Sequence, residues 1–269
     1  ATYPVPDYRA KVSTLAGTAG TSGTTDATGT AAKLNNPYSI TTDGTNLYVA
    51  DFGNHTIRKI VISSGSVTTL AGTAGSSGTM DGTGTAARFN GPAGITTDGT
   101  NLYVAEVYNH TIRKIVISSG VVTTLVGTAG TSGSTDGTGT AARFYKPVGL
   151  TTDGTNLYVA DTYNHTIRKI VISSGVVTTL AGTAGTSGTT DDTGTAAKFK
   201  NPEGITTDGT NLYVAGSNHT IRKVVISSGV VTTLAGTAGS PGSADGTGTA
   251  AKFYYPTGLT TDGTNLYVA

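Results

Sequence analysis

The 269-residue chain has no cysteine, few charged residues and no long apolar run. Without cysteine, disulfides, zinc-thiolate sites and cysteine nucleophiles are excluded. Charged residues make up 12% of the chain and the net charge is +1, so no strong field attracts nucleic acid or an anionic membrane. No stretch of about 18 apolar residues is present to span a bilayer. We therefore expect neither a nucleic-acid partner nor membrane insertion.

Long segments with apolar residues at helical spacing are also missing. The chain has 39 glycines and is rich in threonine and valine, a composition typical of short strands joined by tight turns. At the start of the chain, Ala1 to Tyr8 lacks the basic and apolar regions of a signal peptide. We predict an all-β protein. Its small, threonine-rich and lightly charged residues favour an exported bacterial protein, secreted or periplasmic, after signal removal.

One phrase, TTDGTNLYVA, occurs five times at a nearly constant spacing. The copies begin 55, 55, 55 and then 54 residues apart, at Thr41, Thr96, Thr151, Thr206 and Thr260. A period of this length with strand-like content indicates radial or solenoid repetition, because one small sheet cannot bury its apolar face alone. No linker separates the copies, so residues 1–269 are predicted to form a single domain.

Each period contains four predicted antiparallel strands. In the second copy these are residues 94–97, 102–105, 112–117 and 121–125, with an Asp-Gly hairpin turn after the first strand and a Ser-Ser-Gly turn after the third. Four-stranded sheets repeated around an axis are the blades of a β-propeller. The five hairpins predict five blades.

A glycine-rich connector precedes each blade. Its threonine and two alanines, as at residues 140–142, predict a short helical turn that ends before a proline. One large apolar side chain follows in each copy, and we expect it to fill the gap between blades. These residues are Leu34, Phe89, Phe144, Phe199 and Phe253.

Residues 147–169 carry the pattern Pro-x-Gly-Leu-x-x-Asp, then Leu-Tyr-Val-Ala-Asp, then Asn-His-x-Ile-Arg-Lys. This pattern resembles the NHL-repeat family of β-propellers, and the connector at residues 136–144 resembles the longer connector of bacterial members. The resemblance implies the propeller fold. It leaves the activity open, because family members bind RNA, proteins or glycans and a few are lyases or hydrolases.

The last blade is expected to close with strands from both termini. Residues 260–269 supply only its first two strands, whereas residues 11–17 match a fourth strand and Thr2 to Tyr8 stand in for the third. Unpaired edges would remain if the ring stayed open, and such edges pair with other chains. Self-assembly through the terminal blade edges is therefore one expectation. The stop at Ala269, before the usual Asn-His, also suggests a chain that is part of a longer protein.

Residues that recur once per blade are predicted to be structural. The four histidines lie too far apart around a ring to share one metal ion, and the Asn-His-Thr tripeptides coincide with the repeat pattern although they fit a glycosylation acceptor. Hairpin aspartates suit turn chemistry. A second aspartate in each connector offers too few oxygens for a typical calcium loop. We expect no cofactor, with calcium as the alternative. The aspartates of this second set are Asp26, Asp81, Asp136, Asp191 and Asp245.

Residues that differ between copies gather in the loops after the second strands and before the first strands. A propeller places these segments on one face, and their aromatic and charged residues are our predicted ligand-binding set: Tyr38, Phe52, Tyr108, Tyr145, Lys146, Tyr163, Lys200, Glu203, Tyr254 and Tyr255. No asymmetric catalytic constellation is visible. The sequence thus favours a non-catalytic scaffold that binds a protein or glycan. The alternatives are a metal-dependent lyase or hydrolase at the central channel and a subunit of an extracellular polymer.

Overall fold

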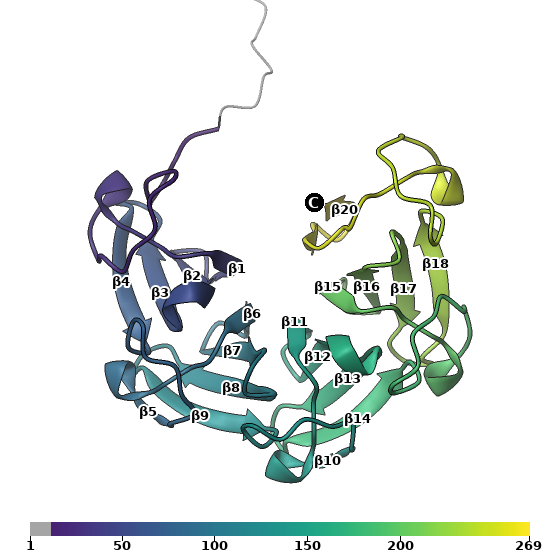
Figure 1. Ribbon diagram of the computed structural model, residues 1–269, viewed down its shortest axis with the longest axis horizontal. Coiled ribbons are helices and arrows are strands. Elements are labelled where there is room, and N and C mark those ends of the chain that lie inside the picture. Colours follow the sequence, from purple (N-terminus) through teal and green to yellow (C-terminus); the bar gives the residue numbers. More distant parts are fainter. Residues whose placement is uncertain (1–11) are drawn as a thin grey trace, which may run out of the picture.

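The computed structural model, which describes residues 12–269, contains four complete antiparallel blades and a smaller fifth sheet, arranged around a central hollow (Figure 1). The blade strands follow one another in sequence order, which confirms the propeller architecture. The first blade holds β1 (Pro37–Thr42), β2 (Asn46–Asp51), β3 (Thr56–Val61) and β4 (Ser66–Ala71), and the second holds β6 (Pro92–Thr97), β7 (Asn101–Glu106), β8 (Thr111–Val116) and β9 (Val121–Val126). The third holds β11 (Pro147–Thr152), β12 (Asn156–Asp161), β13 (Thr166–Val171) and β14 (Val176–Ala181), the fourth β15 (Pro202–Thr207), β16 (Asn211–Gly216), β17 (Ile221–Val225) and β18 (Val231–Ala235), and the fifth β19 (Leu259–Thr261) and β20 (Leu266–Val268).

The Asp-Gly-Thr-Asn turn joins the first two strands of every blade. In the second blade, Asp98 Oδ1 accepts hydrogen bonds from the backbone nitrogens of Thr100 and Asn101 at 2.8 and 2.6 Å, and the Tyr103 hydroxyl donates to Oδ2 at 2.8 Å. Burial acts to raise the pKa of Asp98, but the hydrogen bonds, led by Asn101, outweigh it and hold the pKa below its usual range. The hairpin aspartates are thus turn residues, as expected.

Connectors cover the outer edges of the blades. In two of them β5 (Gly82–Thr83) pairs with β9 and β10 (Gly137–Thr138) pairs with β14, and single bridges join Thr28 to Ser66 and Thr193 to Val230. An edge covered in this way cannot recruit a strand from another chain. The predicted helical turns are 3-10 turns: η1 (Gly29–Ala31), η3 (Gly84–Ala86), η4 (Gly139–Ala141), η6 (Gly194–Ala196) and η7 (Gly248–Ala250), with η2 (Phe52–Asn54) and η5 (Thr162–Asn164) in the loops after second strands.

The hydrophobic core lies between successive blades. Phe144 is fully buried together with Tyr103 of the second blade and Leu157 of the third, and Phe89 and Phe199 occupy the matching positions at the neighbouring junctions. Burying one such phenylalanine contributes roughly 1.5 to 3 kcal/mol. The expected gap-filling role is confirmed for these three. Leu34 and Phe253, at the two ends of the arc, are only partly buried.

The fifth blade differs from the expected four-stranded blade closed by both termini. Its sheet contains only β19 and β20 within residues 12–269, and Val12 to Gly17 forms no strand there. A fourth strand needs a third strand beside it, and the described residues supply none. The proposed third strand, Thr2 to Tyr8, lies outside the described residues. The described blades therefore form an open arc (Figure 1).

Candidate binding face

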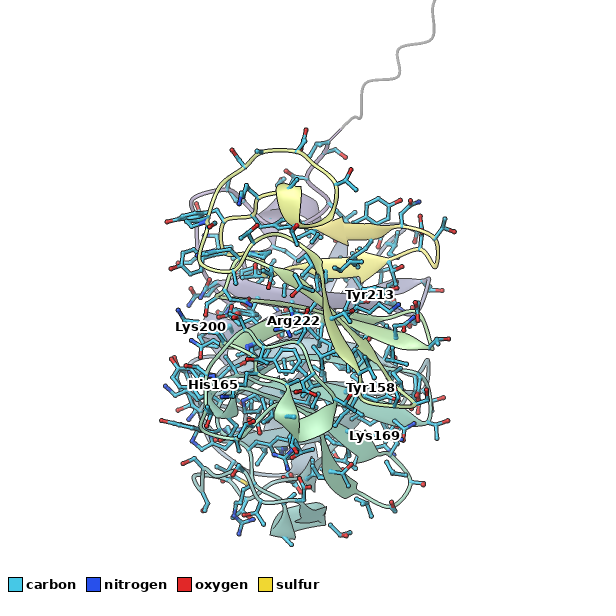
Figure 2. The ribbon with its side chains drawn as sticks, turned by 90° about the vertical axis from the view of Figure 1, so that its right-hand side faces the viewer. Tyr158, His165, Lys169, Lys200, Tyr213 and Arg222 are labelled. Carbon is cyan, nitrogen blue, oxygen red and sulfur yellow. The ribbon has the colours of Figure 1, made fainter. Side chains whose placement is uncertain are left out.

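The loops after the second strands and the segments that enter each blade lie together on one side of the arc. We call this side the loop face; it comprises residues 51–55, 106–110, 161–165 and 216–219 with residues 35–38, 90–93, 145–148, 200–203 and 254–257. Figure 2 shows His165 and Lys200 at this face, whereas Tyr158, Lys169 and Tyr213 point toward the opposite side. Lys200, a member of the predicted set, thus lies on the loop face.

A buried ion pair supports each of the first three loops. In the third blade, Arg168 and Asp161 are both fully buried, and Nη1 of Arg168 lies 2.9 Å from Oδ2 of Asp161. The other oxygen of Asp161 accepts the backbone N–H of Tyr145 at 2.8 Å. Burial raises the pKa of Asp161 to about 6, against the opposing attraction of Arg168. The carboxylate joins the loop to the entry segment of its own blade, so the aromatic residues stand on a rigid base.

The equivalent carboxylates in the first two blades are Asp51 and Glu106, also completely buried. They belong to the variable segments in the sequence, but each forms a buried ion pair beneath the loop and neither contributes to the exposed surface. In the fourth blade Gly216 takes this place, and Arg222 keeps one carboxylate partner, Asp191 at 2.6 Å. Burial lowers the pKa of Arg222, opposed by Asp191.

The asparagines of the Asn-His-Thr tripeptides lie beneath the loop face. The side-chain nitrogen of Asn164 donates to the Gly133 carbonyl at 2.6 Å and to Asp161 Oδ2 at 2.7 Å. Both of its hydrogens are therefore in use, and the side chain is buried. This supports the structural role expected for the tripeptide and leaves no room for a glycan.

Each histidine connects neighbouring blades. His110 Nδ1 accepts the backbone N–H of Lys146 at 3.2 Å, and His55, His165 and His219 accept those of Gly91, Asn201 and Tyr255 in the same way. An accepting Nδ1 requires the neutral ring with its proton on Nε2. Burial lowers the pKa of His110, assisted by the positive charge of Lys146. The histidines are structural residues, as predicted, and the structure identifies their partners.

Three aromatic clusters occupy the loop face. At the junction of blades one and two, the Phe52 ring lies 5.9 Å from Tyr38 and 5.8 Å from Tyr108. Gly91 lies against both Phe52 and Tyr108, where a Cβ would clash with the rings. The three tyrosine and phenylalanine side chains therefore form a continuous cluster, with Tyr38 and Tyr108 about half exposed.

The second cluster lies between blades two and three. Tyr145 packs 5.3 Å from Tyr163 and 5.7 Å from His110, and Lys146 Nζ lies 4.6 Å from the centre of the Tyr163 ring. A lysine over an aromatic face forms a cation–π contact. Aromatic area, hydroxyl groups and a positive charge thus meet on one exposed surface.

The third cluster contains Tyr254, Tyr255 and His219 at the junction of blades four and five, with the two tyrosine rings 5.0 Å apart. Lys200 is exposed on the same face without an aromatic neighbour among the described residues. The sequence prediction missed the histidines as members of these clusters. One feature of the sequence could have indicated them. A tyrosine stands at the blade entry that follows His110 (Tyr145) and His219 (Tyr255), and each histidine ring contacts that tyrosine.

Tyr38 and Glu203 also line the central cavity, whose volume is about 840 Å³. Most of its other lining comes from glycines and aliphatic residues of the innermost strands, including Gly149, Leu150 and Ile205. Burial raises the pKa of Glu203, and it raises the pKa of Tyr38 together with the negative charge of Glu203. These two predicted residues thus face the channel as well as the loop face.

The connector aspartates already have protein partners in the four complete blades. Asp136 Oδ1 lies 2.8 Å from Arg168 Nη2, and the carboxylate also accepts the backbone and hydroxyl of Thr179. Within residues 12–269, no group of three His, Asp or Glu side chains is placed to hold a metal ion. No helix in that part of the chain has the length and apolar character needed to cross a membrane.

Comparison with known proteins agrees with the repeat seen in the blades. The family model of the NHL repeat matches residues 144–170, which run from Phe144 through the first three strands of the third blade. Human NHL repeat-containing protein 2 is 35% identical over 144 residues, covering 50% of this chain and 20% of that protein. The chain thus carries the NHL repeat and is similar to NHL-repeat proteins.

Other relatives share parts of this NHL propeller. Protein SUPPRESSOR OF QUENCHING 1, chloroplastic, from Arabidopsis thaliana is 28% identical over 231 residues, covering 80% of this chain and 22% of that protein. The NHL propeller therefore spans about a fifth of the length of the curated relatives that it matches.

Solved structures agree in fold. A chain of a nidogen/laminin complex has a TM-score of 0.59 at 18% identity, covering 87% of this propeller and 71% of that chain. An auxiliary nutrient binding protein from Bacteroides thetaiotaomicron has a TM-score of 0.58 at 15% identity, covering 87% and 66%. At these identities the likeness concerns the fold alone.

Proposed function

We propose that this NHL propeller is a non-catalytic binding scaffold that engages a protein or glycan through its loop face. The observation that carries the proposal is the presence of three clusters of exposed tyrosines on one face, the first two of which stand on loops supported by buried ion pairs. Rigid aromatic side chains give a large contact area with a hydroxyl at the tip, at little cost in conformational entropy. Nutrient-binding proteins of Bacteroides share the fold, which is compatible with a binding role. A secreted or periplasmic location belongs to the proposal and rests on composition.

The test replaces Tyr108, Tyr145 and Tyr163 together with alanine. Ligands are first selected by screening the purified protein on a glycan array and a panel of extracellular proteins, and affinity is then measured for both forms. We expect at least a tenfold loss of affinity, since each aromatic anchor in an interface contributes about 1 to 2 kcal/mol or more. A matched control replaces Thr45, Thr100 and Thr155, which are exposed in the hairpin turns on the opposite face. Equal affinity of the tyrosine variant and the control would contradict the proposal.

A second candidate is a subunit of an extracellular polymer. The observation in its favour is the exposure of apolar residues at both ends of the arc: Ile40 is 56% exposed, whereas its counterparts Ile95, Leu150 and Ile205 are 4% to 7% exposed. Tyr267 is 54% exposed, whereas Tyr48, Tyr103 and Tyr158 are fully buried. The first surface lies on blade one and the second on blade five, so contact between them in two copies would be head to tail.

A metal-dependent enzyme at the central channel has less support. Glu203 is the charged side chain that lines the cavity, and no histidine lines it among the described residues. A metal site in proteins needs several converging ligands. We therefore place the polymer ahead of the enzyme as the alternative function.

A further inference from the structure

The loop after the second strand of the fourth blade is one residue shorter than its counterparts and lacks their carboxylate. Gly216 pairs with Pro202 at the start of the blade. Asp51, Glu106 and Asp161 pair with the corresponding prolines of the first three blades. A hydrogen atom of Gly216 therefore stands where three blades bury a carboxylate side chain.

Three donors enclose the carboxylate in each of the first three blades. In the third blade, Asp161 accepts hydrogen bonds from Arg168 Nη1 at 2.9 Å, Asn164 Nδ2 at 2.7 Å and the Tyr145 backbone nitrogen at 2.8 Å. The equivalent arginine, asparagine and backbone donors surround the carboxylates of the first and second blades. The arrangement is thus a binding site for one carboxylate group.

The fourth blade retains the three donors. They are Arg222, Asn218 and the backbone nitrogen of Lys200. Within residues 12–269, the Asn218 side chain and the Lys200 nitrogen make no hydrogen bond, and Arg222 Nη1 donates only to the Lys198 carbonyl, at 3.0 Å. Each of these donors therefore has a hydrogen without an acceptor in the described part of the chain.

The side-chain donors are buried. Arg222 is 2% exposed and Asn218 is 5% exposed. The hydroxyl of Thr220 is also buried without a partner among the described residues, whereas the equivalent hydroxyl of Thr111 donates to the Glu106 carboxylate at 2.8 Å. Buried polar groups without a partner are rare because each loses its bonds to water. Several such groups at one place indicate a ligand with acceptor atoms.

The surroundings of the site are the same as in the third blade. Arg222 bonds two connector carbonyls at 3.0 Å each, and Arg168 bonds the equivalent carbonyls at 2.9 and 3.1 Å. The backbone nitrogen of Ser217 donates to the carbonyl of the blade-entry segment at 3.2 Å, and that of Tyr163 does so at 3.1 Å. The shorter loop has therefore not drawn these groups together.

We propose that the fourth blade binds a small free carboxylate, of the size of formate or acetate, between Arg222, Asn218 and the backbone nitrogen of Lys200. Its oxygens accept a charge-assisted bond from the guanidinium and bonds from the two amide groups, as the Asp161 carboxylate does in the third blade. The ligand is small because the side-chain donors lie beneath the loop. The proposal goes beyond the proposed function and does not rest on it, since none of the donors is aromatic.

The experiment titrates sodium acetate at pH 7 into the protein labelled with ¹⁵N-lysine and follows the lysine amides by NMR. We expect the Lys200 signal, assigned with Lys200→Arg, to shift saturably with a dissociation constant of about 10 mM or tighter, as charge-assisted bonds to so small a ligand allow. Lys59, on β3 of the first blade, serves as the internal control. Sodium chloride keeps the ionic strength constant, so the shift reports a preference for acetate over chloride.

A pair of loop variants tests the role of the site. Gly216 and Ser217 are replaced with Asp-Thr-Tyr, the sequence of residues 161–163, and in the matched control with Gly-Thr-Tyr. The inserted residue is needed because a Cβ on Gly216 would lie 2.9 Å from the carbonyl oxygens of Lys200 and Asn201. The aspartate loop supplies the carboxylate from the chain itself, so we expect it to weaken acetate binding at least tenfold, whereas the glycine loop retains binding.

A substitution of nearly equal shape covers the case in which a loop variant does not fold. Asn218→Asp replaces a donor with a negative charge, and we expect it to abolish the acetate response while circular dichroism shows an intact fold. The alanine variant of Tyr108, Tyr145 and Tyr163 should bind acetate like the unaltered chain, so this proposal and the proposed function fail separately. The carboxylate site is wrong if Lys200 shows no saturable shift, or if the folded aspartate and glycine loops, or Asn218→Asp and the unaltered chain, respond alike.

Discussion

At the scale of single residues, the four histidines show how one side chain couples two blades. His55, His110 and His165 adopt left-handed backbone conformations with φ of 59° to 61°. Each Nδ1 accepts the N–H of a blade-entry residue, which is itself left-handed at Gly91, Lys146 or Asn201 in these three junctions. The bond holds the aromatic surface of one blade against the next.

Stability should therefore fall with acidification across the titration range of histidine. Burial lowers the pKa of His55, His110 and His165 in the folded protein. A lowered folded pKa means that the stabilisation is complete above the unfolded value, about 6.5, and is lost as the pH falls through the folded pKa. Lys146 acts in the same direction at His110, whereas the raised pKa of Asp161 acts in the opposite direction over this range. We expect the unfolding temperature to fall by at least about 3 °C between pH 7 and pH 5.

The control replaces the same three histidines with asparagine. Asparagine tolerates the left-handed conformation and offers Oδ1 as an acceptor near the position of Nδ1, but it does not titrate. The triple variant should lose most of the dependence between pH 7 and pH 5 in calorimetric scans. An unchanged pH profile in the variant would assign the dependence to other groups.

At the scale of elements, the innermost strands approach each other closely because a glycine recurs on them. A Cβ on Gly94 would overlap the carbonyl oxygen of Val148 in the next blade, and one on Gly149 would overlap that of Glu203. Blade one has Ser39 at this position, and its pairing differs: Ser39 faces Ala50, a pair that has no counterpart in the second, third or fourth blade. The repeated Pro-x-Gly motif is thus a requirement of packing between blades.

Gly149→Ala is accordingly expected to destabilise the propeller. Overpacking against a backbone oxygen, which has no rotamer to relax into, costs about 1 to 3 kcal/mol. Gly258→Ala is the matched control, because the nearest atom to its Cβ is that of Ala269 at 3.4 Å, an ordinary contact. Thermal unfolding should show a clear decrease for Gly149→Ala and less than about 0.5 kcal/mol for Gly258→Ala. Equal effects would show that close approach does not limit the glycine position.

At the scale of the whole molecule, the open arc leaves two different surfaces at its ends. Ile40 and Tyr267 are exposed where their counterparts are covered by a neighbouring blade. Two surfaces that differ from each other and belong to one chain associate head to tail, which produces rings or filaments and not symmetric dimers.

We therefore expect concentration-dependent association that Ile40→Asp weakens. A charge buried in the apolar contact between blades would have no partner, so assembly should decrease at least tenfold in sedimentation velocity. Met80→Asp is the control, since Met80 is 58% exposed on a connector away from the ends. A protein that stays monomeric at all accessible concentrations would remove the polymer as a function.

Much of this architecture could be predicted from the sequence, because the turns and strands of each repeat are determined by residues close to one another in the chain. The Asp-Gly-Thr-Asn turn determines the hairpin through bonds that Asp98 makes within three residues. The large apolar residue that recurs after each connector turn predicts the position of Phe144 between blades. The loop face followed from strand order alone. The partners of His110 and Asp136 could not be predicted, since the bonds they make cross 36 and 43 residues of chain.

The sequence by itself determined the blade, the repeat number and the side of the molecule on which the copies differ. Only the tertiary structure decided that Asp51, Glu106 and Asp161 form buried ion pairs, although they lie in loops whose sequence varies between the repeats. It also decided that the connector aspartates of the four complete blades bind the arginines of the third strands. The physical reason is that local bonding follows from neighbouring residues, whereas burial and pairing depend on which blade lies alongside, and the last blade of the described arc has none beyond it.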